Sequence, residues 1–264
     1  MNRLEKILAH KRLEVAERQR LLPQARLEEQ AASARPVPSF SGALRRLPNQ
    51  PVRLIAEIKR ASPSRGTLAA DLRAADLAQI YLENGAAAVS VLTDEHFFCG
   101  SMDDLRSVTA LPDAPPVLCK DFIFSTYQIL EARAAGAAAV LLIAACLPTG
   151  ELKRLQVFAQ QTGMQALIEV HTPAELEKAL ECEPVLIGVN NRDLTTFEVH
   201  LETSLRLIEH IPDDVVRVAE SGIHTSQDAH RLAEAGFDAL LVGEALVTSP
   251  DPGEKLRELL ERAV

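Results

Sequence analysis

The chain has 264 residues, of which 47% are hydrophobic and 25% are charged, and its formal net charge is -9. This composition excludes disordered, collagen-like and coiled-coil proteins. The acidic balance and the absence of a long Lys/Arg block argue against nucleic acid and membranes as partners, because both attract a positive surface. We therefore expect a small-molecule partner, and the length fits one α/β barrel of about 250 residues.

The cysteines and the longest apolar run indicate in which cell compartment the protein is found. Cys99, Cys119, Cys146 and Cys182 are widely separated and form no C-x-x-C motif, which favours reduced thiols over a disulfide framework or a zinc site. Residues 134–147 form an apolar run of 14 residues, shorter than the roughly 20 needed to cross a bilayer. The N-terminus lacks the apolar segment of a secretory signal, so the sequence predicts a cytoplasmic protein.

The first 50 residues differ from the rest of the chain in their sequence pattern. Residues 2 to about 30 place apolar side chains at spacings of three and four among charged residues, which predicts an amphipathic helix. Prolines 36, 38, 48 and 51 then indicate a linker, with a short helix around residues 40–47. We therefore expect an N-terminal helical extension and linker, residues 1–50, before a second unit, residues 51–264.

From residue 54 onward, short continuous apolar runs alternate with helical patterns. Eight such runs are present, at residues 54–58, 88–92, 116–119, 139–143, 166–168, 185–189, 217–219 and 239–242. They are typical of parallel strands covered on both faces, and the segments between them are long enough for crossover helices. The sequence thus predicts a single (β/α)8 barrel, a TIM barrel. An open doubly wound sheet is the alternative, but no G-x-G-x-x-G follows the first strand.

Three helix-to-strand junctions repeat almost literally. Gly85, Gly136 and Gly236 each stand between the end of a predicted helix and a buried apolar run. A glycine in this place adopts the left-handed conformation that ends a helix. The repetition favours a regular chain of βα units.

Polar residues repeatedly end the apolar runs. Substrates of (β/α)8 barrels bind at the C-terminal ends of the strands, so these positions are candidates for a site. Because side chains alternate along a strand, turning the polar residues toward the barrel axis sends Cys119, Ile168 and Ala219 outward against the helices. A single polar end is more often part of a structural ion pair, but convergence of several favours one shared site. The polar end residues are Glu57, Lys59, Lys120, Glu169, Asn190, Arg192, Glu220 and Ser221.

Glycines after the last two runs indicate an anion site. Ser221 and Gly222 follow the seventh run, and Gly243 and Glu244 follow the eighth. Glycines there let backbone N–H groups approach a phosphate, as in barrel phosphate sites. Taken alone, the first motif is equally typical of a plain turn.

We expect the remaining acidic and histidine residues near the strand ends to be structural and not to bind metal or act in catalysis. Asp94, Glu95 and His96 are consecutive, which suits a solvated loop better than a metal site, and we predict no metal. For His171 and His224 we expect hydrogen bonding beside the site or helix capping. Cys99 and Cys119 are expected to be packing residues.

Six motifs in order carry a family likeness. They are EIKRASPS at 57–64, VLTDEHFFCGS at 91–101, KDFI at 120–123, EVH at 169–171, NNRDL at 190–194 and ESGI at 220–223. Together they resemble the indole-3-glycerol-phosphate synthase family of tryptophan biosynthesis. The likeness covers essentially the whole chain, including the extension, which in that family lies across the C-terminal mouth of the barrel.

The resemblance implies an activity without a metal or organic cofactor. The reaction is the conversion of 1-(2-carboxyphenylamino)-1-deoxyribulose 5-phosphate to indole-3-glycerol phosphate, carbon dioxide and water, so the partner is a small anionic substrate. Lys120 would be the general acid for the substrate ketone. Glu169 would be the base and acid of the later dehydration, and Lys59 would hold anionic groups of the substrate. The family likeness is compatible with a monomer or a homodimer.

The resemblance also assigns the remaining site residues. Beside the three named above, Glu57, Asn190, Glu220 and Ser221 would complete the catalytic polar network. Substrate contacts would come from Arg192 and Ser62, from Phe98, Phe122 and Leu194 around the aromatic ring, and from the backbone at Gly222, Gly243 and Glu244 around the phosphate. Glu244 departs from the small hydroxyl residue common at this position, so its carboxylate has to point away or be screened.

Other functions remain open at this level. A strand-end lysine also suits a Schiff-base aldolase or another phosphosugar-converting barrel enzyme. A sugar-phosphate isomerase is less suited, because no Cys or Asp stands at a strand end facing the axis. A non-catalytic phosphate-binding barrel would bind ligand without turnover. The N-terminal helix is either a surface cover or a lid that excludes water.

Overall fold

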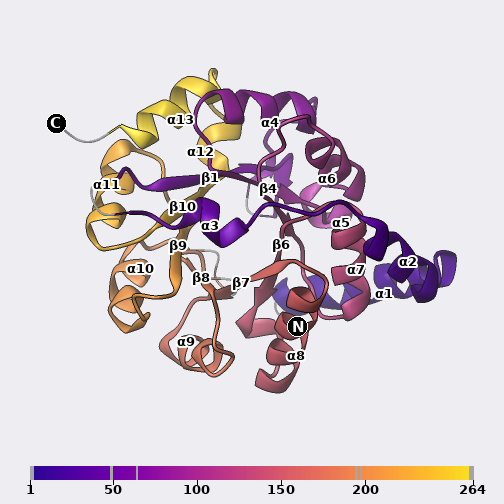
Figure 1. Ribbon diagram of the computed structural model, residues 1–264. Helices are drawn as coiled ribbons and strands as arrows, with labels where there is room; N and C mark the ends of the chain where they lie inside the picture. The colour runs from indigo at the N-terminus through magenta and orange to yellow at the C-terminus, as the bar shows by residue number, and fades with distance from the viewer. Residues whose placement is uncertain (1–2, 48–49, 64, 194–195, 197, 262–264) are drawn as a thin grey trace.

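In the computed structural model, which describes residues 3–47, 50–63, 65–193, 196 and 198–261, eight parallel strands close into a barrel (Figure 1). The strands pair in the cyclic order β1-β10-β9-β8-β7-β6-β5-β4. All eight predicted runs are strands, and the predicted TIM barrel is confirmed. The bounds are β1 Arg53–Ile58, β4 Ala88–Leu92, β5 Val117–Lys120, β6 Ala139–Ile143, β7 Gln165–Val170, β8 Leu186–Asn190, β9 Val216–Glu220 and β10 Ala239–Val242.

Helices connect successive strands and cover the outside of the barrel. They are α4 Ala74–Glu83, α5 Glu95–Phe98, α6 Met102–Thr109, α7 Thr126–Ala134, η1 Ala144–Cys146, α8 Thr149–Gln161, α9 Pro173–Leu180, α10 Glu202–Leu207, η2 Ile208–His210, α11 Ser226–Glu234, α12 Glu244–Val247 and α13 Pro252–Leu260. A small antiparallel pair, β2 Ala61–Ser62 and β3 Gly66–Thr67, follows β1.

Local sequence sets where these helices begin and end. The side chains of Ser101 and Thr172 accept hydrogen bonds from backbone N–H groups of α6 and α9, and Thr225 forms a capping box with Asp228 at the start of α11. The three predicted junction glycines have φ values of 97°, 86° and 106° at Gly85, Gly136 and Gly236, so the expected left-handed helix ends are confirmed.

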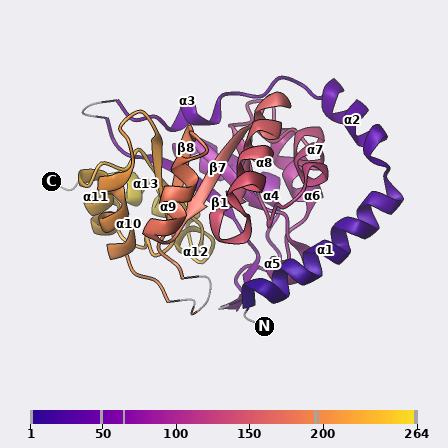
Figure 2. The same cartoon turned by 90° about the horizontal axis from the view of Figure 1, so that it is seen from below.

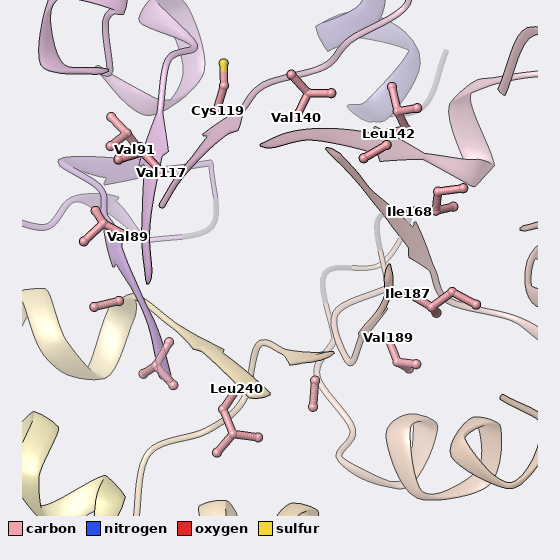
Figure 3. Packing of buried hydrophobic residues seen from close by; sticks show 14 of the residues in the cluster. Val89, Val91, Val117, Cys119, Val140, Leu142, Ile168, Ile187, Val189 and Leu240 are labelled. Carbon is pink, nitrogen blue, oxygen red and sulfur yellow. The ribbon is translucent and has the colours of Figure 1, made fainter. Parts of the chain in front are cut away.

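Two of the three buried apolar clusters among the described residues form the core of the barrel. Residues on the outer faces of the strands pack against the helices, and Figure 3 shows these side chains pointing away from the barrel centre. Cys119, Ile168 and Ala219 belong to this outer cluster, as predicted. Alternate residues such as Ile55, Leu118 and Leu167 fill the barrel interior. The polar residues that share this inward orientation therefore meet at the mouth.

The N-terminal extension runs along the barrel from one end to the other. Its helices are α1 Arg3–Leu21, α2 Gln24–Ser33 and α3 Phe40–Leu44. Figure 2 shows α1 and α3 at opposite ends of the barrel, with α2 on the side between them. Phe40 and Leu44 are completely buried against the barrel interior, whereas Ile7 joins the same cluster from the mouth.

Two expectations about local structure are wrong. The single helix expected up to about residue 30 is split, because Pro23 lacks the N–H that an uninterrupted helix would need and stands between α1 and α2. Cys99 is exposed and adopts a left-handed conformation (φ 53°) at the end of α5, so it is not a packing residue. All four cysteines are free thiols. No helix within the described ranges is long and apolar enough to cross a membrane.

Candidate active site

A cavity opens at the C-terminal ends of the strands, and it brings the sequence-predicted residues together. Leu194 lies outside the described residues, and every other predicted site residue lines the cavity. These are Glu57, Lys59, Ser62, Phe98, Lys120, Phe122, Glu169, Asn190, Arg192, Glu220, Ser221, Gly222, Gly243 and Glu244. Leu4 and Ile7 of α1 complete the lining on one side.

Lys120 holds the centre of the site. It is the last residue of β5, and its ammonium lies 2.8 Å from a carboxylate oxygen of Glu220 and 3.5 Å from one of Glu169. Glu169 and Glu220 come from β7 and β9, and both are almost fully buried. The barrel thus places one cation between two carboxylates at the base of the cavity.

Burial and charge shift the pKa values of this triad in different directions. Burial alone would lower the pKa of Lys120, but Glu220, Glu169 and Glu57 outweigh it and raise the pKa above its usual range. Burial and the neighbouring carboxylates raise the pKa of Glu220, although Lys120 opposes them. For Glu169 burial also acts upward, but Lys120 and His171 prevail and lower its pKa. The site therefore holds a charged lysine and an ionised Glu169.

His171 supports Glu169 from outside the cavity. One ring nitrogen lies 3.3 Å from Glu169, and the other lies 3.0 Å from Glu175 at the start of α9. Burial lowers the pKa of His171, yet the two carboxylates raise it to about 10. This matches the predicted hydrogen-bonding role beside the site. His224 donates its backbone N–H to Asp228, the residue of the α11 capping box.

Glu57 and Lys59 form a second charged pair at the end of β1. The ammonium of Lys59 lies 2.6 Å from a carboxylate oxygen of Glu57. Glycines make room for the buried carboxylates. A Cβ on Gly243 would lie 2.3 Å from Glu57, and one on Gly188 would lie 2.2 Å from Glu220. Any larger residue at Gly188 in β8, or at Gly243 directly after β10, would displace a site carboxylate.

A strained turn follows β9. Ser221 and Gly222 both have positive φ, 66° and 78°, and a left-handed conformation is uncommon for a serine. The side chain of Asn191 donates to the Ser221 carbonyl at 3.0 Å and holds the turn from the end of β8. A Cβ on Gly222 would lie 2.5 Å from Val199, so this turn requires glycine. Its backbone faces the cavity beside Gly243.

The carboxylate of Glu244 is screened by two arginines. Arg65 lies 2.8 Å from one of its oxygens, and Arg192 lies 3.7 Å from the other. The negative charge beside the glycines is thus balanced, as the sequence required. Arg192 lines the cavity together with Gly222 and Gly243 and brings positive charge to that side, whereas Arg65 contacts Glu244.

Apolar side chains form the opposite wall. Phe98 at the end of α5 and Phe122 after β5 have ring centroids 6.1 Å apart. Leu4 and Ile7 of α1 lie on the same cavity. This wall suits a flat apolar group, whereas the glycine side with its arginines suits an anion.

The sequence did not predict the buried contact between Lys11 and two aspartates beside the site. Lys11 of α1 is buried in contact with Asp94 and Asp121. The prediction of a solvated loop at residues 94–96 is therefore wrong for Asp94, which is fully buried because Lys11 neutralises it. Among the described residues, no three His, Cys, Asp or Glu side chains are grouped as metal ligands.

Comparisons with known sequences match the chain over nearly its full length. Residues 4–259 match the family model described as indole-3-glycerol phosphate synthase. Relatives of that name from Chloroherpeton thalassium and a Polaromonas species are each 48% identical to the chain. The first alignment covers 94% of this chain and 96% of the relative, and the second covers 97% of both.

Solved structures share the barrel at low sequence identity. 3-Hexulose-6-phosphate synthase from Salmonella typhimurium aligns with a TM-score of 0.64 and 14% identity, over 79% of this chain and 96% of that one. Thiamine phosphate pyrophosphorylase from Pyrococcus furiosus aligns with a TM-score of 0.59 and 17% identity, over 79% of this chain and 93% of that one. At these identities the comparisons support the fold alone.

Proposed function

The chain belongs to the indole-3-glycerol phosphate synthase family, carboxy-lyases of tryptophan biosynthesis that act on a small phosphorylated substrate, and from this premise we propose which side chains carry each step. The substrate, 1-(2-carboxyphenylamino)-1-deoxyribulose 5-phosphate, has an aromatic ring at one end and a phosphate at the other. Its ring lies between Phe98 and Phe122, and its phosphate lies against the backbone of Gly222 and Gly243. Ser62, which lines the same cavity, completes the substrate contacts.

Lys120 is the general acid of ring closure. The ring carbon that bears the carboxylate attacks the ketone carbon, and the ketone oxygen gains negative charge as the new bond forms. A positioned ammonium delivers its proton to that oxygen and leaves a hydroxyl. The raised pKa of Lys120 keeps it protonated until the oxygen becomes strongly basic. The carboxylate of Glu220 binds and orients the ammonium, and the charges of Glu220 and Glu57 favour its protonated form.

Loss of carbon dioxide then restores the aromatic ring, because the electron pair of the broken carbon–carbon bond returns to it. The remaining step expels the hydroxyl as water and removes a proton from the five-membered ring. Glu169 is the acid and base group of this step. Its lowered pKa in the free site favours the carboxylate, which accepts the ring proton and then passes that proton to the departing hydroxyl, so that water leaves and the carboxylate is restored; Asn190 and His171 orient it.

Charge balance supports this assignment. Lys59 binds the anionic groups of the substrate and exchanges its contact with Glu57 for them. Arg192 and the backbone of Ser221, Gly222, Gly243 and Glu244 neutralise the phosphate. Glu244, whose carboxylate follows Gly243 at the proposed phosphate position, is already paired with arginines.

The single observation that carries the proposal is the place of Lys120 between Glu169 and Glu220 on the floor of the cavity. An alternative Schiff-base reaction needs a neutral amine as nucleophile. The carboxylates around Lys120 favour its charged form and so oppose that role. Borohydride treatment with a ketose phosphate tests this point, because a covalent adduct on Lys120 or Lys59 would contradict an acid-only role.

The direct test is the appearance of indole fluorescence from the carboxyphenylamino substrate with a metal chelator present. We expect full activity with chelator, since the proposed chemistry uses side chains only. Activity that requires added metal would overturn this part of the proposal. Binding of substrate without any indole product would instead favour a non-catalytic phosphate-binding barrel.

We also propose that the extension, residues 1–50, acts as a lid on the barrel, residues 51–264. Leu4 and Ile7 support this, because they line the cavity and exclude water from the apolar wall. A cytoplasmic location is supported by the four free thiols, which persist in reducing compartments.

A further inference from the structure

Lys11 in α1 is a fully buried lysine beside the mouth of the barrel. Its ammonium lies 2.7 Å from Glu14 of the same helix, 2.7 Å from Asp94 and 3.1 Å from Asp121. Asp94 directly precedes α5, and Asp121 directly follows β5. One cation of the N-terminal extension therefore joins two separate loops of the barrel.

Lys11 keeps its positive charge in this buried contact with the two aspartates. Asp94 is 0% exposed and Asp121 is 6% exposed, so little water reaches the two carboxylates and the ammonium is their main counter-charge. Burial lowers the pKa of Lys11, but Asp121 and Asp94 raise it by more, and the lysine is protonated at physiological pH. Removing it would leave two buried carboxylates without a counter-charge. A helix that only covered the surface would not need such a contact.

Asp94 holds the short helix that ends at Phe98, the first aromatic residue of the cavity wall. Its carboxylate accepts a hydrogen bond at 2.7 Å from the backbone N–H of Phe97 and so caps α5. This helix has only four residues and ends at Phe98, which lines the cavity. The place of the Phe98 ring therefore depends on where Asp94 is held.

Asp121 holds Phe122, the second aromatic residue of the cavity wall. Its carboxylate accepts hydrogen bonds from the backbone N–H of Phe122 at 2.7 Å and from the hydroxyl of Thr93 at 2.9 Å. Thr93 directly precedes Asp94, so the two loops are also tied to each other. Lys11 completes this arrangement as the shared cation of both carboxylates.

We propose that Lys11 is a positioning residue that fixes the spacing of Phe98 and Phe122, and so the slot for the aromatic ring of the substrate, by binding Asp94 and Asp121 together. The inference rests on the proposed function, which places the ring between these two side chains. The phosphate side of the cavity, with Gly222 and Gly243, has no contact with Lys11. Loss of Lys11 therefore acts on ring binding and leaves phosphate binding alone.

The test compares Lys11→Met with Lys6→Met, the same change at an exposed lysine of the same helix. Three quantities are measured: the kinetic constants for the full substrate, the Kd of 2-aminobenzoate as a probe of the ring slot, and the Kd of inorganic phosphate. The two binding measurements need no turnover, so they stay informative if the proposed catalytic roles are wrong. Circular dichroism checks that the barrel is intact.

For Lys11→Met we expect at least a tenfold rise in substrate KM and in the Kd of 2-aminobenzoate, with kcat reduced less than threefold and the Kd of phosphate within twofold of wild type. Lys11→Arg keeps the cation and should recover most of the ring binding. Lys6→Met should match wild type throughout.

Equal weakening of 2-aminobenzoate and phosphate binding would overturn the proposal, because it would mean that Lys11 only stabilises the fold. So would unchanged ring binding in a folded Lys11→Met protein. If Lys11→Met does not fold, Lys11→Arg decides through the same two Kd values. A wild-type enzyme that forms indole product but does not bind 2-aminobenzoate would contradict the ring slot itself.

Discussion

The ammonium of Lys120 lies 3.5 Å from the carboxylate of Glu169, although the two residues are 49 positions apart in the chain. The closed parallel barrel creates this proximity, because β5 and β7, which are separated by β6, deliver their last inward-facing side chains to the same mouth. In the proposed reaction the two groups act in turn on one substrate. Each also fixes the protonation state of the other before the substrate arrives.

Removing the Lys120 ammonium should abolish most of the activity. General acid catalysis contributes about 10²- to 10⁴-fold, so Lys120→Met should lower kcat by a factor in that range while substrate still binds. Steady-state indole fluorescence and a separate binding titration measure the two effects. Lys153→Met, a change of the same kind in α8 away from the cavity, serves as control. Near-normal turnover in Lys120→Met would remove Lys120 from its assigned role.

Gly188 should be intolerant of a side chain. A Cβ there would lie 2.2 Å from the carboxylate of Glu220, so Gly188→Ala should push Glu220 away from Lys120. Misplacement of a catalytic group by about 1 Å can cost about 10²-fold, and we expect kcat to fall between about ten- and a hundredfold. Gly150→Ala in α8 is the matched control, because no atom lies within 4 Å of its added Cβ. Equal kcat values for the two variants would show that the position of Glu220 is unimportant.

Glu244 is paired with Arg65 and Arg192, so at the proposed phosphate site its carboxylate would compete with the substrate phosphate for both arginines. One charge pair near a protein surface is worth about 1 kcal/mol, and removing the carboxylate frees both arginines. Glu244→Gln should therefore lower the Kd of inorganic phosphate about five- to tenfold, as measured by calorimetry. A weaker phosphate affinity in this variant would mean that Glu244 orients the arginines for the phosphate and does not compete with it.

His171 should link stability to alkaline pH. Despite the downward effect of burial, Glu169 and Glu175 raise its pKa to about 10 in the folded protein, above about 6.5 in the unfolded chain. The folded state thus binds this proton more tightly, so its stabilising effect is complete below about pH 6.5 and is lost as pH rises toward 10. Between pH 7 and 10, Tm should fall more steeply for wild type than for His171→Gln. Parallel Tm curves would contradict the shifted pKa.

The sequence predicts the barrel well because its determinants are local. Each strand is a short apolar run, several runs end in polar residues, and the junction glycines stand shortly before their strands, so these signals are visible without any knowledge of distant contacts. The same regularity locates the site, since strand ends of a closed barrel meet at one mouth. The family likeness supplied the individual roles, which the spacing of residues alone does not contain.

Contacts between distant segments are what the sequence did not reveal. Asp94 is a charged residue among charged neighbours, which is typical of a solvated loop, and only its buried partner Lys11, 83 positions earlier, makes its burial possible. The pairing of Glu244 with Arg65 is equally remote in the chain. The break at Pro23 was visible in the sequence, but the apolar spacing on either side of it resembled one continuous helix.

The order of decarboxylation and dehydration, and the assignment of dehydration to Glu169, are tested most directly by a single turnover of Glu169→Gln in which carbon dioxide and indole are followed in the same sample. We predict that carbon dioxide appears at close to the wild-type rate, whereas indole fluorescence lags at least a hundredfold, because ring closure and decarboxylation need Lys120 but dehydration needs the Glu169 carboxylate. Carbon dioxide and indole that appear together, at whatever rate, would contradict the assignment of dehydration to Glu169.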